Sequence, residues 1–438
     1  MIGSAPLVPA GVHELLGQHL LVDGFDMVLD LAASRGSRLV DARNGTSYLD
    51  LFTFFASSAL GMNHPALVDD PRFTADLLEA ARNKPSNSDV YTVAMARFVE
   101  TFARVLGDPA LPHLFFVEGG ALAVENALKV AFDWKSRRNE SLGLSAEGSK
   151  VLHLREAFHG RSGYTLSLTN TDPVKTARFP KFDWPRIPAP YLSSGSDVGA
   201  REAEALSAAR AAFMQHPHDI ACFVMEPIQG EGGDHHFRPA FLQAMQDLCR
   251  EFDALLVLDE VQTGCGLTGT AWAYQQLGVQ PDVVAFGKKT QVCGVMAGGR
   301  VDEVVDNVFA VSSRINSTWG GSLVDMVRAR RVLEVMEAER LIPRAAVAGE
   351  HLMRLLQDLA ARHDAVTDVR GRGLMCAFSL PGREIRDAVL TSMREDEHVL
   401  LLGCGTRSIR FRPALTVSEA DLAAGVAALD RALERLHL

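Results

Sequence analysis

Residues 283–294 read VVAFGKKTQVCG, an apolar run followed by a glycine and two lysines. The run, residues 283–286, has the length of a strand. Short apolar runs bounded by turns are typical of buried strands in a mostly parallel sheet. A lysine such as Lys288 is costly at the end of a buried strand unless its charge is paired or its pKa is lowered. Partly buried lysines of this kind form Schiff bases, whereas a surface lysine is the plainer interpretation of this stretch taken alone.

The same pattern occurs at four earlier places in the chain. Apolar runs that lead into polar residues occupy residues 114–117, 151–154, 220–225 and 255–258. Residues 121–137 have the apolar spacing of a helix. The five runs together predict an α/β fold with a mostly parallel sheet, and in such sheets ligands bind beyond the carboxyl ends of the strands.

Three further groups of residues follow predicted strands, and each has a functional and a structural interpretation. Asp259 fits a protonated ring nitrogen or a metal, although helix capping is the commonest role of such an aspartate. Residues 119–121 fit a phosphate cradle at a helix start, because glycines let backbone N–H groups approach an anion. Phe158 fits a stacking contact with a flat cofactor, and His159 beside it fits an ordinary hydrogen-bonded turn. Only the combination of these groups with Lys288, each beyond a strand, favours a cofactor site.

The combined motifs resemble the class III, fold-type I aminotransferases that use pyridoxal 5'-phosphate (PLP). The motifs are Glu118-Gly119-Gly120-Ala121, Phe158-His159-Gly160-Arg161, Asp259-Glu260-Val261-Gln262-Thr263-Gly264 and Pro281-Asp282 followed by Lys288. Residues 83–89 and 286–294 are similar to the branch of this class that acts on L-lysine. The resemblance covers essentially the whole chain. It implies a large domain with a mostly parallel sheet of the seven-stranded type and a smaller α+β domain.

The resemblance also implies roles for individual residues. Lys288 would carry PLP, because in this class the lysine stands six positions after the aspartate of the Pro-Asp pair, which selects it over Lys289. Asp259 would keep the ring nitrogen protonated, and Gln262 would approach the ring hydroxyl. The other implied cofactor contacts are Phe158 and His159 at the ring, Gly120 and Ala121 at the phosphate, and Thr318 at the phosphate from the other subunit of a homodimer.

For the substrates, the resemblance implies transfer of the terminal amine of L-lysine to 2-oxoglutarate in two half-reactions. The products would be 2-aminoadipate 6-semialdehyde and glutamate. Arg410 resembles the arginine that binds a carboxylate next to the reacting carbon, and Glu231 resembles the acid that masks it. Arg161 would hold the distal carboxylate. A solvated loop acid is the alternative interpretation of Glu231, and Leu267 stands where the class usually has an arginine.

Other functions share these core residues. An ω-aminotransferase acting on ornithine or 4-aminobutyrate would differ only in its substrate pocket. An aminomutase on the same fold would work without a keto-acid acceptor. A catalytically idle regulator with the PLP fold is a different class, but the intact set of Lys288, Asp259 and Phe158 argues against it, as does the lack of a predicted DNA-binding appendage.

Length and composition limit the remaining classes. With 438 residues, the chain suits two domains: we expect a PLP-binding domain over residues 61–323, a small α+β domain over residues 324–438, and an N-terminal segment, residues 1–60, that packs with the small domain. The net charge of −10 does not favour nucleic-acid or membrane partners. No apolar run approaches the roughly 20 residues that span a bilayer, and no secretion signal is recognisable. We expect a cytoplasmic protein with reduced cysteines and no metal site.

Overall fold

The computed structural model describes residues 7–145 and 147–438, so residues 1–6 of the predicted N-terminal segment lie outside the described residues. The largest sheet has seven strands in the order β3-β11-β10-β9-β6-β4-β5. Their bounds are β3 (His113–Val117), β4 (Lys150–Leu154), β5 (Arg186–Ile187), β6 (Ile220–Met225), β9 (Leu255–Asp259), β10 (Val283–Phe286) and β11 (Cys293–Ala297). All five predicted strands are confirmed. The sheet is parallel except for β11, which pairs antiparallel with β10 and β3.

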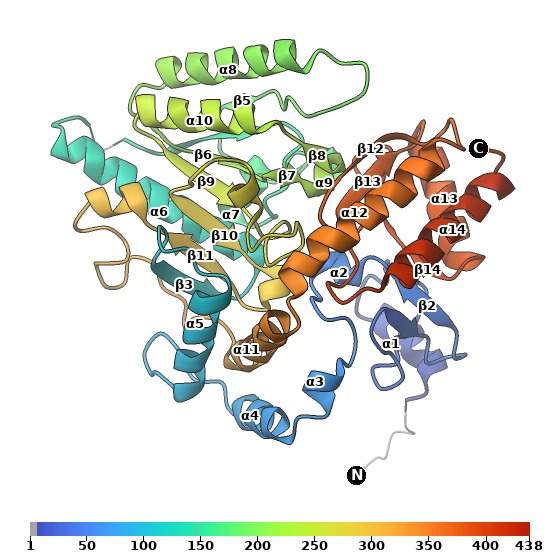
Figure 1. Ribbon diagram of the computed structural model, residues 1–438. Helices are drawn as coiled ribbons and strands as arrows, with labels where there is room; N and C mark the ends of the chain where they lie inside the picture. The colour runs from blue at the N-terminus through green and yellow to red at the C-terminus, as the bar shows by residue number, and fades with distance from the viewer. Residues whose placement is uncertain (1–6, 146) are drawn as a thin grey trace.

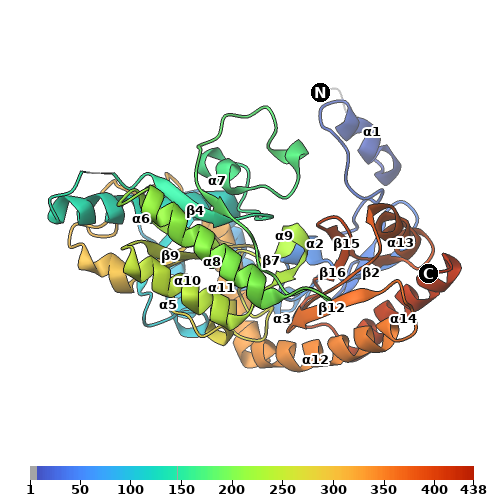
Figure 2. The same ribbon diagram turned by 90° about the horizontal axis from the view of Figure 1, so that it is seen from above.

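Side chains of this sheet alternate between two covered faces. On one face, residues such as Val224 and Val257 pack against the long helix α6 (Gly120–Ser141), which confirms the helix predicted there. On the other, residues such as Phe223 and Leu256 pack against several helices. These are α5 (Val93–Val105), α8 (Val198–Gln215), α10 (Pro239–Glu251) and α11 (Leu323–Ala338), with α8 and α10 side by side at the top of Figure 1 and at the front of Figure 2. Both faces are therefore buried, as the continuous apolar runs require.

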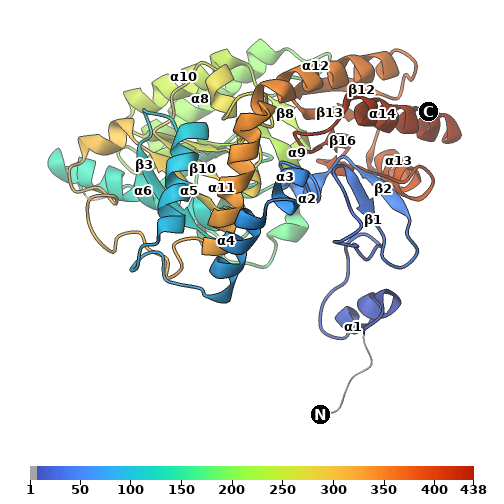
Figure 3. The same ribbon diagram turned by 60° about the horizontal axis from the view of Figure 1, so that its bottom comes forward.

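A second, antiparallel sheet has the order β12-β13-β16-β15. Its strands are β12 (Thr367–Arg372), β13 (Met375–Ser379), β15 (Leu402–Cys404) and β16 (Ser408–Phe411), and its helices are α12 (Leu341–Ala360), α13 (Arg383–Glu395) and α14 (Glu419–Arg435). A third sheet joins the two ends of the chain, because β2 (Ser47–Asp50) pairs with β1 (Arg38–Val40) on one side and β14 (Val399–Leu400) on the other. Figure 3 shows β1 and β2 beside α13.

The domain boundaries at residues 60 and 323 stay predictions. Helix α11, which begins at Leu323, packs against α4 (Pro71–Arg82) and α5. Besides five 3-10 helices in the described residues, the remaining short elements are α1 (Val12–Gly17), α2 (Thr53–Ala56), α3 (Pro65–Val68), α7 (Gly163–Leu168), α9 (Gly230–Gly233), β7 (Ile228–Gln229) and β8 (His235–His236). Within the described ranges, no helix combines the length and the apolar character needed to cross a membrane.

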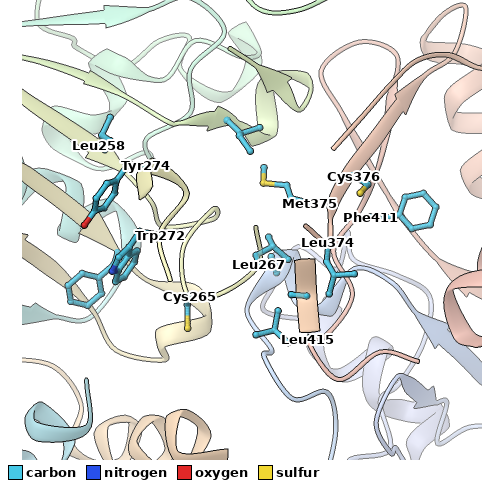
Figure 4. Packing of buried hydrophobic residues seen from close by; sticks show 14 of the residues in the cluster. Leu258, Cys265, Leu267, Trp272, Tyr274, Leu374, Met375, Cys376, Phe411 and Leu415 are labelled. Atoms are coloured by element: carbon cyan, nitrogen blue, oxygen red, sulfur yellow. The ribbon is translucent and has the colours of Figure 1, made fainter. Parts of the chain in front are cut away.

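Leu267 lies where the loop after β9 contacts the C-terminal sheet. Its side chain is fully buried, and its carbonyl accepts a hydrogen bond of 2.9 Å from the N–H of Leu374. Figure 4 shows it beside Leu374 and Leu415. Leu267 therefore lies in the apolar core. An unpaired charged side chain at this position would be energetically costly.

Candidate active site

A cavity of about 590 Å³ opens at the carboxyl ends of the parallel strands, within the size range of small-molecule sites. It brings together residues that follow β3, β4, β6, β9 and β10, with Arg410 from β16 facing them. The predicted site residues that line it are Gly120, Ala121, Phe158, His159, Arg161, Glu231, Asp259, Gln262, Lys288 and Arg410. Thr318 is the exception, because it is exposed and does not line the cavity of this subunit.

The two neighbouring lysines point to different places. Lys288 lines the cavity, and its pKa is lowered by burial and by the positive charge of Arg410, while Asp259 acts in the opposite direction. Lys289 is almost fully buried, and its Nζ donates a hydrogen bond of 2.6 Å to the carbonyl oxygen of Ala56. Lys288 is thus the amine available in the cavity, and its lowered pKa increases the fraction that is neutral and nucleophilic at a given pH.

Asp259 ends strand β9 and is held in place by two donors. Its Oδ2 lies 2.7 Å from Nδ1 of His159, and its Oδ1 accepts a hydrogen bond of 3.0 Å from the N–H of Val261. Burial alone would lower the pKa of His159, but the hydrogen bond and charge of Asp259 outweigh it, so that the pKa is raised. The histidine therefore orients the carboxylate that lines the cavity.

The loop between β3 and α6 forms a close-fitting cradle. Gly119 has a φ of 105°, a left-handed conformation that favours glycine. A Cβ on Gly120 would lie 2.9 Å from Val261 Cγ1, and one on Gly160 would lie 2.5 Å from Ala121 Cβ. These close approaches leave the N-terminus of α6 accessible from the cavity, where its free N–H groups and helix dipole suit an anion such as phosphate.

Gln262 is oriented by a buried ion pair that the motifs did not reveal. The Nε and Nη2 atoms of Arg412 donate hydrogen bonds of 3.0 and 2.9 Å to Gln262 Oε1. Arg412 also donates to Asp234 at 2.8 Å, and both charged side chains are fully buried. Because the amide oxygen is already used, the amide nitrogen is the group that Gln262 has left to offer as a donor.

Arg410 and Glu231 meet inside the cavity, although 179 residues separate them in sequence. Nη2 of Arg410 donates a hydrogen bond of 3.0 Å to Glu231 Oε2. The other carboxylate oxygen, Oε1, accepts a hydrogen bond from Lys175. Arg161 lines the same cavity from an exposed position. The arginine is thus covered by an acid in this structure, and the side chain of Glu231 is only partly exposed.

Sequence reasoning missed several residues of the cavity. Glu226 was recognisable, because it follows the apolar run of β6 as Asp259 follows that of β9. It accepts hydrogen bonds from the N–H groups of Phe158 (2.9 Å) and Gly230 (3.0 Å), and burial raises its pKa to about 7. Lys175 had no local signal, since it lies in a polar connection 56 residues before its partner. Phe55 and Cys293 also line the cavity and were not predicted.

The model of the family Aminotransferase class-III matches residues 22–433. The chain belongs to the class III aminotransferases. It is 69% identical to the L-lysine-epsilon aminotransferase of Mycobacterium tuberculosis, over 99% of this chain and 97% of the relative. It is 61% identical to the enzyme of the same name from Streptomyces clavuligerus, over 97% of this chain and 93% of the relative. The solved structure of lysine aminotransferase from M. tuberculosis in the internal aldimine form superposes with a TM-score of 0.97 at 68% identity, covering 98% of this chain and all of that one.

Class III aminotransferases use PLP, and the groups in this cavity suit it. PLP carries a phosphate, an aldehyde, a ring hydroxyl and a ring nitrogen that is protonated in its active form. The glycine cradle at α6, the amine of Lys288 with its lowered pKa, the amide of Gln262 and the carboxylate of Asp259 match these four groups in kind. The predicted fold class and cofactor are confirmed.

Proposed function

We propose that this aminotransferase transfers the terminal (ε) amine of L-lysine to 2-oxoglutarate, giving 2-aminoadipate 6-semialdehyde and glutamate. The observation that carries the proposal is the Arg410–Glu231 pair in the cavity that also contains Lys288. The names of relatives at 61–69% identity over nearly the full length of the chain support the same substrate.

The two substrates place opposite demands on Arg410. Lysine presents its terminal amine with its carboxylate far from the reacting carbon, whereas glutamate has a carboxylate directly beside it. While Glu231 is paired with Arg410, the carboxylate compensates the positive charge of the arginine. The cavity then suits the aliphatic end of lysine. When Glu231 withdraws, Arg410 offers its guanidinium to the adjacent carboxylate of glutamate or 2-oxoglutarate, and Arg161 holds the distal carboxylate. Paired N–H donors make arginine suitable for both partners.

When bound, PLP supplies an aldehyde that reacts with amines and a ring that withdraws electrons from the reacting carbon. Lys288 would hold the cofactor through its aldehyde, and its free amine would move a proton at the substrate carbon as a general base and acid. Asp259 holds the proton on the ring nitrogen, with His159 orienting its carboxylate. Phe158 would pack on the ring, Gln262 would donate to the ring hydroxyl oxygen, and the N–H groups of Gly120 and Ala121 would bind the phosphate.

We also propose a cytoplasmic homodimer in which Thr318 binds the phosphate held by the other subunit. Two properties of the chain are compatible with this arrangement. Thr318 is exposed and lies outside the cavity of its own subunit, and the N-terminal part of the chain exposes large apolar residues, including Leu20, Leu21 and Val22. Exposed apolar groups in one region are typical of protein–protein interfaces.

The proposed reaction is tested with lysine labelled with ¹⁵N at either of its two amines. We expect the ε label to appear in glutamate, detected by mass spectrometry, and the α label to stay in the cyclised semialdehyde product. Omission of 2-oxoglutarate distinguishes an aminomutase, which would still form product. Ornithine and 4-aminobutyrate, tested in parallel, should react at least tenfold more slowly per unit concentration. Transfer of the α label, or faster reaction with either competitor, would contradict the proposal.

A neutral isostere of Glu231 tests the masking role. We expect Glu231→Gln to slow the lysine half-reaction roughly ten- to hundredfold, the value of a lost hydrogen bond between charged groups, because lysine then meets an uncovered Arg410. The glutamate half-reaction should change less than about threefold, since Arg410 is free in that step in any case. Stopped-flow absorbance measures each half-reaction separately, and Glu231→Asp serves as a control that keeps the charge. Equal losses in both half-reactions would count against masking.

A further inference from the structure

Glu231 has a second cationic partner, Lys175, to which the reaction described above gives no role. Lys175 ends the short 3-10 helix η2 (Pro173–Lys175) in the connection between α7 and β5. Its Nζ binds Oε1 of Glu231, while Arg410 binds Oε2. Lys175 also lines the cavity, with Nζ 5.5 Å from the centroid of the Phe158 ring. The carboxylate of Glu231 therefore lies between two cations that come from distant parts of the chain.

The position of Lys175 is set by local structure as well as by Glu231. Asp172 caps η2 by accepting a hydrogen bond of 3.0 Å from the N–H of Val174. The Nζ of Lys175 also lies 3.4 Å from the hydroxyl oxygen of Thr171. These contacts do not involve Arg410, so they do not depend on the group that the arginine binds.

The charges of the three side chains explain what Lys175 contributes. Arg410 is 2% exposed, and Glu231 and Lys175 are 29% and 25% exposed, so none is freely solvated. When a substrate carboxylate binds Arg410, Glu231 loses that partner. Without Lys175, two carboxylates would then lie near one cation in a partly buried site, which is electrostatically unfavourable. With Lys175, each carboxylate keeps a cation of its own.

We propose that Lys175 is a positioning residue that retains Glu231 while Arg410 binds a dicarboxylate substrate, and that it thereby favours the glutamate half-reaction. This inference rests on the proposed function for the identity of the two substrates. In the lysine half-reaction Glu231 stays on Arg410, so Lys175 contributes little to that step. Loss of Lys175 should therefore slow the glutamate half-reaction more than the lysine half-reaction, which is the reverse of the effect expected for Glu231→Gln.

Single substitutions of Lys175 test which of the two half-reactions is slowed more. We expect Lys175→Met to lower the second-order rate constant of the glutamate half-reaction roughly five- to tenfold, as for loss of a partly exposed charged hydrogen bond. The loss should arise from a higher KM rather than a lower kcat, and the lysine half-reaction should change less than about twofold. Lys175→Arg should restore the rate, and Lys181→Met, at an exposed lysine on the same connection, should have no effect. Equal losses in the two half-reactions would overturn the proposal.

Two further measurements separate this role from a direct attraction for substrate and from the proposed function itself. In a Glu231→Gln background, Lys175→Met should have almost no additional effect, because the carboxylate partner of Lys175 is absent. An undiminished effect would overturn the proposal.

Calorimetric titration with glutarate, an unreactive dicarboxylate, should give a Kd five- to tenfold higher for Lys175→Met than for wild type or Lys181→Met. An unchanged Kd would overturn the proposal. The titration requires no turnover, so it still tests Lys175 if the lysine labelling experiment fails.

Discussion

Lys288→Ala is expected to reduce turnover by a factor on the order of 10⁴ or more, because it removes the side chain proposed both to attach PLP and to act as the general base. The protein should also lose the covalent bond to PLP that borohydride reduces, and with it the visible absorption of the attached cofactor. Both readouts follow from the placement of the side chain, which is the lysine of the 288–289 pair that lines the cavity. Absorbance spectra and peptide mass spectrometry after borohydride treatment measure the attachment directly.

Lys289→Met is the matched control for this prediction. The amine of Lys289 binds the carbonyl oxygen of Ala56 and does not line the cavity. Burial lowers its pKa to about 7, so its loss removes a costly buried amine together with one hydrogen bond. We expect the variant to keep a reducible bond on Lys288. If Lys288→Ala still carried a PLP bond to the chain that borohydride reduces, the assignment of the attachment site would be wrong.

Asp259→Asn should have the second-largest effect, a loss on the order of 10²- to 10³-fold in kcat, the size found when one preorganised electrostatic contact is removed. The loss should be equal in the lysine and glutamate half-reactions, because both depend on the same protonated ring nitrogen. This symmetry distinguishes Asp259 from Glu231 and Lys175, whose variants should affect the half-reactions unequally. Stopped-flow measurement of both half-reactions with one enzyme preparation tests it, and an unequal loss would refute the common role.

The same substitution has a consequence that does not depend on turnover. Asp259 raises the pKa of His159 above its ordinary value of 6.5 against the effect of burial. A raised pKa stabilises the folded chain below pH 6.5, and this stabilisation is lost as the pH rises through the folded-state pKa. In the cofactor-free protein, Asp259→Asn should therefore lower the pKa of His159, measured by NMR. The difference in Tm between wild type and variant should be larger at pH 6 than at pH 9.

Local patterns in the sequence were enough to predict most of the large sheet. Continuous apolar runs are required where a parallel strand is covered on both faces, and all five predicted runs became strands. The same reasoning did not find β5, which has only two residues, or β11, an antiparallel strand interrupted by Gly294. A Cβ at Gly294 would lie 2.3 Å from the carbonyl oxygen of Phe115, so the glycine is explained only by the neighbouring strand.

The sequence by itself determined the order of the strand-end motifs, the family and the preference for Lys288, because these depend on short-range spacing along the chain. The tertiary structure decided which way each side chain points and which distant charges meet. Lys175, Glu231 and Arg410 come from the 3-10 helix η2, the glycine-rich helix α9 and the strand β16 of the C-terminal sheet. The family resemblance indicated Glu231 and Arg410, whereas nothing in the segment around Lys175 indicates its partner. Their contact depends on how the sheets pack together, and packing of distant segments leaves no periodic signal in the chain.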